Sequence, residues 1–201
     1  MGQGKNKNAT GKLRIIGGIW RSRVLPVVDL PGLRPTTDRV RETLFNWLQN
    51  DISGARCLDL FAGSGALGFE AASRGSASVV MLELQSDAAN NLAKNIQVLK
   101  ANSIQLIRED AIGWLKNSGS PVDSQQRFDI VFLDPPFDSD YMAEACELLE
   151  KQQCLSDEAF IYLEIDSKQS LPELPESWSI IREKKAGQVS YFLAKRNSGI
   201  R

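Results

Sequence analysis

A regular alternation of strand-like and helix-like segments begins at Ala55 and constrains the fold more than any other feature of the chain. Its first unit is CLDLFAGSGALGFEAASRG (residues 57–75), in which a buried-strand pattern leads through a glycine-rich loop into a helix pattern. Further strand patterns, separated by helix patterns, follow at SVVMLEL, SIQLIRED, FDIVFLD and AFIYLEID. This alternation predicts an α/β protein with a mostly parallel sheet covered by helices on both faces. The last two strand patterns meet at a tight turn around Gly187, which predicts an antiparallel pair.

The beginning of the chain has a different organisation. Residues 1–12 are polar, and we expect them to form a disordered tail. Residues 13–28 alternate apolar and polar side chains around Gly17-Gly18, a pattern typical of a β-hairpin.

A helix pattern then leads into the alternating units. Thr36, Thr37 or Asp38 can cap this helix at its N-terminus. A length of 201 residues suits one domain with a small appendage. We therefore expect a basic hairpin and lead-in helix over residues 13–50 and a main domain over residues 51–201.

Charge is unevenly distributed along the chain, although the net charge is only −1. Residues 1–56 contain ten Lys and Arg but four Asp and Glu, a net charge of +6, so the remainder carries −7. A basic segment attached to an acidic body favours binding of a polyanion such as nucleic acid over a merely solvated basic face.

The chain contains three cysteines and no histidine. Cys57, Cys146 and Cys154 have neither zinc-site spacing nor the pattern of a disulfide framework, so we expect two buried thiols and one near the surface, in a reducing cytoplasm. Without histidine, the chemistry must use carboxylates, backbone groups or a cofactor, and no metal site is expected. No apolar run suits a bilayer span, and the N-terminus lacks the apolar core of a secretory signal, so no membrane partner is expected.

The glycine-rich loop, residues 63–68, spells GSGALG and matches the G-x-G-x-x-G pattern of dinucleotide-binding enzymes. Glu83 ends the second strand pattern, twenty residues after Gly63, where it can accept hydrogen bonds from two ribose hydroxyls of a nucleotide cofactor. Asp59, at the end of the first strand pattern, distinguishes between two possible cofactors, a dinucleotide and S-adenosylmethionine. Its carboxylate would repel a pyrophosphate but attract the ammonium and sulfonium groups of S-adenosylmethionine.

The fourth strand pattern ends in Asp134-Pro135-Pro136-Phe137. The Asp134 carboxylate and the Pro135 carbonyl can accept hydrogen bonds from the two N–H groups of a base's exocyclic amine. These hydrogen bonds aim the lone pair of the amine at a methyl group and stabilise the positive charge that develops on its nitrogen. The prolines stiffen the loop, and Phe137 offers a flat face to a base drawn out of its stack. Asp-Pro-Pro alone is more often a strand-ending turn, but its place after the fourth strand favours amino-methyl transfer.

Asp110 ends the third strand pattern, directly before Ala111. It can accept a hydrogen bond from the adenine amine of the cofactor, or it can cap the helix pattern AIGWLKN. One residue can do both.

The chain resembles the RsmD family of bacterial 16S rRNA guanine-N2 methyltransferases. The resemblance runs from about Leu13 to Lys195 and is carried by RIIGGIWRSRVL, RPTTDRVRETLFNWL, CLDLFAGSGALGFEA, FLDPPF and EKKAGQVSYFL. The RPTTDRVRE block is specific to this family and close relatives, whereas DPPF is shared with many amino-methyltransferases.

This resemblance implies a class I S-adenosylmethionine-dependent methyltransferase, with a Rossmann-like, mostly parallel seven-stranded sheet whose last strand is antiparallel. It implies methylation of one guanine amine in 16S rRNA, within the assembled or assembling small ribosomal subunit and among its proteins. We expect a cytoplasmic monomer that does not bind DNA.

By the same resemblance, residues of three kinds are expected. Those that hold the cofactor are Thr36, Arg39, Asp59, Phe61, Ala62, Gly63, Ser64, Gly65, Glu83, Asp110 and Ala111. Those that hold the guanine are Asp134, Pro135, Pro136 and Phe137. Those that grip rRNA phosphates are Arg14, Arg21, Arg23, Arg34 and Arg41.

Three other functions stay open on the sequence. An amino-methyltransferase of DNA adenine or of a protein glutamine would use the same DPPF segment. A nicotinamide-dependent oxidoreductase would use the glycine loop, although Asp59 argues against it. A non-catalytic ribosome assembly factor could keep the pocket without turnover.

Overall fold

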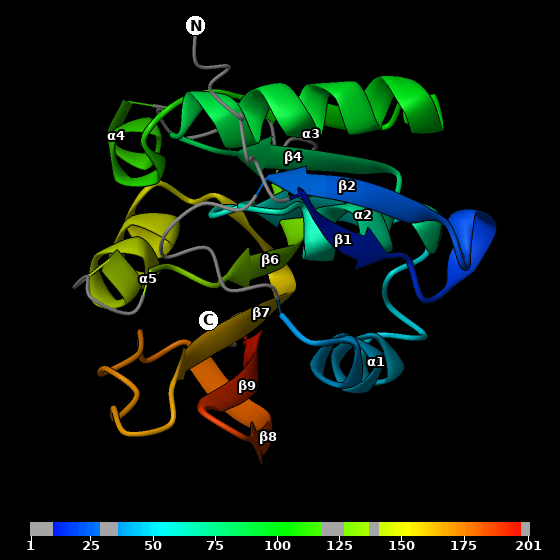
Figure 1. Ribbon diagram of the computed structural model, residues 1–201. Helices are drawn as coiled ribbons and strands as arrows, with labels where there is room; N and C mark the ends of the chain where they lie inside the picture. The colour runs from blue at the N-terminus through cyan, green and yellow to red at the C-terminus, as the bar shows by residue number, and fades with distance from the viewer. Residues whose placement is uncertain (1–9, 29–35, 118–126, 137–140, 198–201) are drawn as a thin grey trace, which may run out of the picture.

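The computed structural model of the protein describes residues 10–28, 36–117, 127–136 and 141–197 (Figure 1). One seven-stranded sheet runs through the molecule in the order β5-β4-β3-β6-β7-β9-β8. Its strands are β3 (Arg56–Asp59), β4 (Ser78–Leu82), β5 (Ile104–Ile107), β6 (Phe128–Leu133), β7 (Leu155–Asp166), β8 (Trp178–Ala186) and β9 (Val189–Arg196).

Neighbouring strands from β5 to β7 are all parallel, whereas β9 is antiparallel to both β7 and β8. The expected mostly parallel sheet with an antiparallel last strand is therefore confirmed. β9 inserts between β7 and β8, so β8 lies at the edge and runs in the same direction as β7. β7 begins at Leu155, four residues before the AFIYLEID pattern that predicted this strand.

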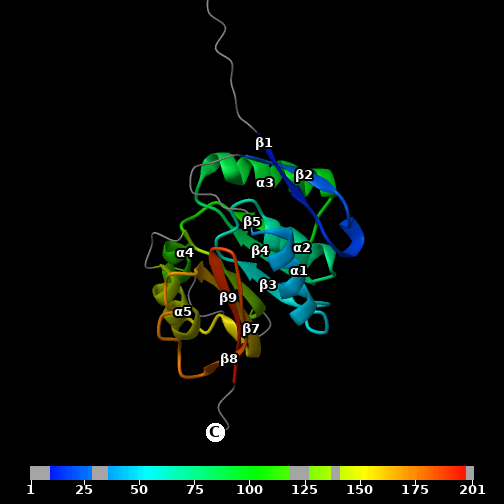
Figure 2. The same cartoon turned by 60° about the horizontal axis from the view of Figure 1, so that its bottom comes forward.

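Helices cover both faces of the sheet (Figure 2). They are α1 (Asp38–Trp47), α2 (Ala66–Ser73), α3 (Ser86–Leu99), α4 (Ala111–Asn117) and α5 (Tyr141–Lys151). Buried side chains of α1, α2 and α3 form one core cluster with one face of the sheet, and those of α4 and α5 form a second cluster on the other face. Of the three possible caps of α1, Thr37 fills the position, because its side chain accepts a hydrogen bond from Val40 N.

The N-terminal hairpin pairs β1 (Thr10–Arg14) with β2 (Val24–Val28) in an antiparallel two-stranded sheet. Because β1 begins at Thr10, residues 10–12 belong to a strand, although the sequence placed them in the tail. The hairpin side chains Leu13, Ile15 and Leu25 are buried in the same core cluster as α1 and α2.

The connection between β1 and β2 is longer than a tight turn and contains a 3₁₀ turn at Gly18–Trp20. Gly18 has φ +73°, and a Cβ atom there would lie 1.8 Å from the carbonyl oxygen of Ser73 in α2. The glycine therefore allows the hairpin to approach the end of α2 closely, in a backbone conformation that suits glycine.

All three cysteines are buried, so the expectation of one thiol near the surface is wrong. Cys154, directly before β7, is 2% exposed because it packs in the core cluster beneath α5. Within the described ranges, no helix is long and apolar enough to cross a membrane.

Candidate active site

A cavity of about 650 Å³ opens at the carboxyl ends of the parallel strands, a volume that suits a small-molecule ligand. The chain turns from β3 toward β4 and β5 and then returns to β6 on the other side, so the cavity lies at the switch point of the sheet. Seven acidic residues and no Lys or Arg line it, counting the residues that the structure describes: Asp59, Glu83, Glu109, Asp110, Asp134, Glu164 and Asp166. This lining favours a cationic ligand.

The glycine loop after β3 forms one wall of the cavity. Phe61, Ala62, Gly63 and Ser64 all line it, as expected. Ala62 N donates to the Leu82 carbonyl at the end of β4, which fixes the loop to the neighbouring strand.

Glu83, just after β4, is placed in the cavity wall as predicted. Its Oε2 accepts a hydrogen bond of 2.8 Å from Gly63 N, and its Oε1 accepts one of 2.7 Å from Gln85 N. Two backbone N–H groups thus hold the carboxylate beside the glycine loop. Each oxygen keeps lone-pair capacity for a further donor.

Asp59 lies at the end of β3 and is 2% exposed. Its Oδ2 accepts a hydrogen bond of 3.0 Å from Gly68 N in α2. Burial raises the pKa of Asp59 to about 7, although the Gly68 N–H lowers it, and the charge of Glu83 raises it further. A cation in the cavity would favour the ionised carboxylate.

Asn in place of Asp59 is expected to stabilise the ligand-free protein at neutral and alkaline pH. Between the ordinary pKa of 3.8 and about 7, the folded protein keeps a proton that the unfolded chain has released. The free energy of unfolding therefore falls as the pH rises through this window, by an amount on the order of 2–4 kcal/mol. Asn keeps an acceptor for the Gly68 N–H without the charge.

Urea unfolding of the wild type and Asp59→Asn at pH 4 and pH 8 checks this expectation. The variant should be clearly the more stable of the two at pH 8 and nearly equal to the wild type at pH 4. A stability difference that is the same at both pH values would contradict the raised pKa.

Gly65 is not among the residues that line the cavity, so its expected contact with the cofactor stays a prediction. It has φ +77° at the start of α2, and a Cβ atom there would lie 2.6 Å from the side chains of Phe69 and Leu92. The residue therefore permits the close packing of α2 and α3.

Asp110 and Ala111 both line the cavity beyond β5. Asp110 Oδ2 accepts a hydrogen bond of 2.6 Å from Gly113 N, so the helix-cap role is present. Because Asp110 also lies in the cavity wall, it can cap the helix and accept a hydrogen bond from the cofactor at the same time.

Asp134 follows β6 directly and lines the cavity with Pro135 and Pro136. The Thr36 hydroxyl donates a hydrogen bond of 3.2 Å to Asp134 Oδ2, so Thr36 joins the site through this carboxylate. Burial raises the pKa of Asp134 well above its ordinary value, and the negative charge of Glu164 raises it further. Asp134 is consequently a better proton acceptor than an ordinary aspartate.

Glu164, near the end of β7, is a cavity residue that the sequence analysis missed. It is 4% exposed, and the Tyr162 hydroxyl donates a hydrogen bond of 2.6 Å to its Oε2. The available signal was the strand pattern AFIYLEID, whose glutamate falls beside Asp134 if the two strands are neighbours.

Three other predicted site residues do not lie in the described cavity wall. Arg39 is exposed on α1 and is not among the residues that line the cavity, so its expected place beside the cofactor stays a prediction. Phe137 and Arg34 lie outside the described residues. The cavity also has an aromatic pair that the sequence did not predict, in which Phe61 stacks on Tyr141 with ring centroids 6.1 Å apart.

Of the five arginines expected to grip RNA, Arg21 and Arg23 are exposed in the connection of the hairpin. Neither forms an ion pair with another described residue. Arg14 is also exposed, with 64% of its side chain accessible, but its guanidinium pairs with Asp38 at 2.9 Å.

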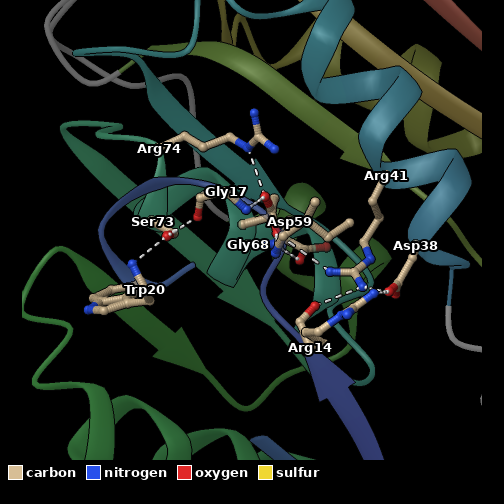
Figure 3. Close-up of polar contacts among 11 residues, drawn as sticks. Arg14, Gly17, Trp20, Asp38, Arg41, Asp59, Gly68, Ser73 and Arg74 are labelled. Carbon is tan, nitrogen blue, oxygen red and sulfur yellow. Dashed lines mark hydrogen bonds and ion pairs between the residues drawn. The ribbon is translucent and has the colours of Figure 1, made fainter. Parts of the chain in front are cut away.

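Arg41 is buried in α1 with 1% of its surface exposed, so its predicted contact with RNA is wrong (Figure 3). Its Nη2 donates to Asp38 Oδ1 at 2.6 Å and to the Arg14 carbonyl at 3.0 Å, and its Nη1 lies 3.6 Å from Glu70 Oε2. The guanidinium ties α1 to the hairpin and to α2 instead of facing solvent.

Glu70 in α2 is fully buried and joins the hairpin to the main sheet. Its two oxygens accept the backbone N–H groups of Ile16 and Gly17 at 2.9 and 2.8 Å, and Arg74 Nε donates to it at 2.8 Å. The Ser73 hydroxyl adds a contact to the Gly17 carbonyl (Figure 3). These hydrogen bonds fix the hairpin, which bears the exposed arginines, to α2.

Comparison with known proteins shows that nearly the whole chain is similar to methyltransferases. A family model described as "Conserved hypothetical protein 95" matches residues 13–195. Ribosomal RNA small subunit methyltransferase D of Escherichia coli K12 is 49% identical over 193 residues, covering 96% of this chain and 94% of that protein. The Haemophilus influenzae protein of the same name is 48% identical, covering 92% and 95%.

The solved structure of the Escherichia coli protein yhhF, named there as a proposed methyltransferase, is similar throughout. It has a TM-score of 0.85 at 46% sequence identity and covers 94% of this chain and 99% of that chain. The expected class I methyltransferase fold is confirmed.

Proposed function

Because the chain belongs to the RsmD family, we propose that it transfers a methyl group from S-adenosylmethionine to the exocyclic N2 amine of one guanine in 16S rRNA. The observation that carries this proposal is the placement of Asp134-Pro135 in the acidic cavity, on the opposite side of Asp59 from Glu83. The residues expected to hold a cationic cofactor and those expected to hold a base amine thus share one cavity.

The lining residues fit the chemistry of this cofactor. Asp59 would attract its ammonium group, Glu83 would accept hydrogen bonds from its ribose hydroxyls, and Asp110 and Ala111 would border its adenine. The glycine loop, which lines the cavity, would supply the remaining contacts. A dinucleotide would bring its pyrophosphate against this acidic lining, which disfavours an oxidoreductase.

S-adenosylmethionine supplies an electrophilic methyl group on a positively charged sulfur. Asp134 and the Pro135 carbonyl accept the two N–H bonds of the guanine amine and orient its lone pair toward that methyl. The lone pair of the amine would form the new N–C bond while the C–S bond of the cofactor breaks, and the electron pair of the C–S bond would leave with sulfur. Asp134 stabilises the positive charge on nitrogen and takes the proton that leaves, for which its raised pKa suits it.

The substrate is the small ribosomal subunit or an assembly intermediate, with its proteins, and the enzyme acts on it as a cytoplasmic monomer. The names of the most similar relatives support the ribosomal RNA substrate. The basic hairpin supports a contact with RNA phosphates, because Arg21 and Arg23 are exposed there without ion-pair partners among the described residues.

Replacing Arg21 and Arg23 by Ala is expected to weaken binding to small subunits and to lower the slope of log affinity against log salt concentration by about 1–2. For each phosphate contact that is lost, binding releases about one counterion fewer from the RNA. Lys116→Ala/Lys151→Ala is the matched control, because it removes two cations from α4 and α5, on the other side of the sheet. An unchanged slope for the arginine variant would contradict the role of the hairpin.

Methyl transfer from labelled S-adenosylmethionine to four acceptors tests the proposed substrate. The acceptors are small subunits from a strain that lacks this gene, naked 16S rRNA, transfer RNA and duplex DNA. We expect label in the subunits above all. Label chiefly in transfer RNA or DNA would contradict the substrate, and no label with intact cofactor binding would support an assembly factor.

A further inference from the structure

We propose that Glu164 selects guanine as the substrate base, by accepting the ring N1–H beside the N2 amine that Asp134 holds. This inference rests on the proposed function, because it names the feature by which the same site recognises its base. It assigns a task to a cavity residue that the transfer chemistry itself does not use.

The register of the sheet places Glu164 beside Asp134. β6 and β7 are parallel neighbours in which Leu133 pairs with Leu163, so the next residue of each chain is one of these two acids. Both acids line the cavity. The negative charge of Glu164 contributes to the raised pKa of Asp134, in agreement with this proximity.

The two acidic side chains also face the same side of the sheet. Phe132 and Tyr162 precede them by two residues and are buried together in the core cluster of α1 and α2. Since side chains two apart along a strand point to the same face, Glu164 within β7 points toward that side. Thr36, at the start of the α1 region, donates to Asp134 from there.

The order of strands places Glu164 on the side of the cavity expected to hold the substrate base, away from the residues expected to hold the cofactor. The expected cofactor residues Asp59, Glu83 and Asp110 stand at the ends of β3, β4 and β5. β6 with Asp134 comes next, and β7 with Glu164 lies beyond it. A ligand group that reaches Glu164 past Asp134 therefore belongs to the methyl acceptor.

A buried donor holds Glu164 in place. The Tyr162 hydroxyl donates to Oε2 at 2.6 Å, and the pKa of Tyr162 is raised well above its ordinary value by burial and by the charge of Glu164. Tyr162 therefore keeps its proton and stays a donor. A carboxylate that is 4% exposed and fixed in this way is a preorganised acceptor in the cavity wall.

The Watson–Crick edge of guanine matches two adjacent carboxylates. Guanine presents N1–H next to its exocyclic amine, so donors face both acids. Adenine and cytosine present a bare ring nitrogen, an acceptor, next to theirs. Such a base would leave a buried carboxylate opposite a lone pair, which is strongly unfavourable.

A specificity switch tests the inference. Small subunits reconstituted with guanine or with 2-aminopurine at the target position both offer a C2 amine, but the N1 of 2-aminopurine is an acceptor. We expect wild-type kcat/KM to favour guanine by about 10²–10³-fold. Glu164→Gln, whose amide can donate to N1, should reduce this ratio to about tenfold or less. Both enzymes meet the same loss of the guanine O6, so the change in ratio reports on N1.

Glu158→Gln, on the exposed part of the same strand, is the matched control and should keep the wild-type ratio. A Glu164→Gln ratio equal to that of the wild type would overturn the inference. If that variant fails to fold, the wild type still decides, because 2-aminopurine methylation within tenfold of guanine would also overturn it. A wild type that methylates no guanine would overturn the proposed function instead.

Discussion

Replacing Asp134 by Ala should lower the rate of methyl transfer by at least about 10²–10³-fold, while the affinity for S-adenosylmethionine changes only a few-fold. The reason is that Asp134 lies at the end of β6, on the side of the cavity away from the expected ribose and adenine residues. Its carboxylate acts on the amine as positive charge develops and is not needed to hold the cofactor. Single-turnover rates and calorimetric titration measure the two effects separately.

Asp134→Asn is the matched variant for this comparison. It keeps an acceptor oxygen for the Thr36 hydroxyl but loses the negative charge, so its rate should fall between that of Asp134→Ala and that of the wild type. Turnover of Asp134→Ala within tenfold of the wild type would contradict the role assigned to this carboxylate.

Replacing Glu70 by Ala should destabilise the protein by about 3–5 kcal/mol. Glu70 is fully buried, lies 3.6 Å from the buried Arg41 guanidinium and accepts the backbone N–H groups of Ile16 and Gly17. Its loss leaves a buried cation with one carboxylate fewer and two N–H groups without their acceptors. Urea unfolding monitored by tryptophan fluorescence measures the change.

Glu158→Ala is the control for this prediction, because Glu158 is 75% exposed and pairs with Lys195 at the surface. A surface pair of this kind contributes about 0–1 kcal/mol. If Glu70→Ala were no more destabilising than Glu158→Ala, the buried cluster would not hold the hairpin to α2.

The order of elements and the edge of the sheet that carries the cavity could be predicted from the sequence. Apolar strand patterns and amphipathic helix patterns are local properties, and alternating units place the carboxyl ends of the strands at one edge. Asp59, Glu83 and Asp134 each stand directly after or at the end of such a pattern, and the structure brings all three to the cavity.

The fate of Arg41 could not be read from its charge. Of its two acidic partners, Asp38 is three residues away but Glu70 is far along the chain, and only the fold brings α1 and α2 together. A local signal did exist, because Arg41 precedes the buried Leu44, Phe45 and Leu48 by three, four and seven residues and so lies on the buried face of α1.

Gly65 and Glu164 show a different limit. A glycine in a ligand loop has the same letter whether a ligand or a neighbouring helix needs the space, and only the packing shows that Leu92 of α3 occupies the space beside Gly65. Glu164 gained its meaning only when the register of β6 and β7 placed it beside Asp134. Contacts across elements are set by packing, which a single sequence does not display.

The most direct test of the central claim is the identity of the modified nucleoside. 16S rRNA from subunits treated with the wild-type enzyme and S-adenosylmethionine would be digested and analysed by mass spectrometry, with Asp134→Ala as the blank. Relative to untreated subunits, we expect a gain of one N2-methylguanosine per particle with the wild type and, in the same short reaction time, at most about a hundredth of that gain with the variant. A methyl group on any other atom or base, or its equal appearance with both enzymes, would contradict the account.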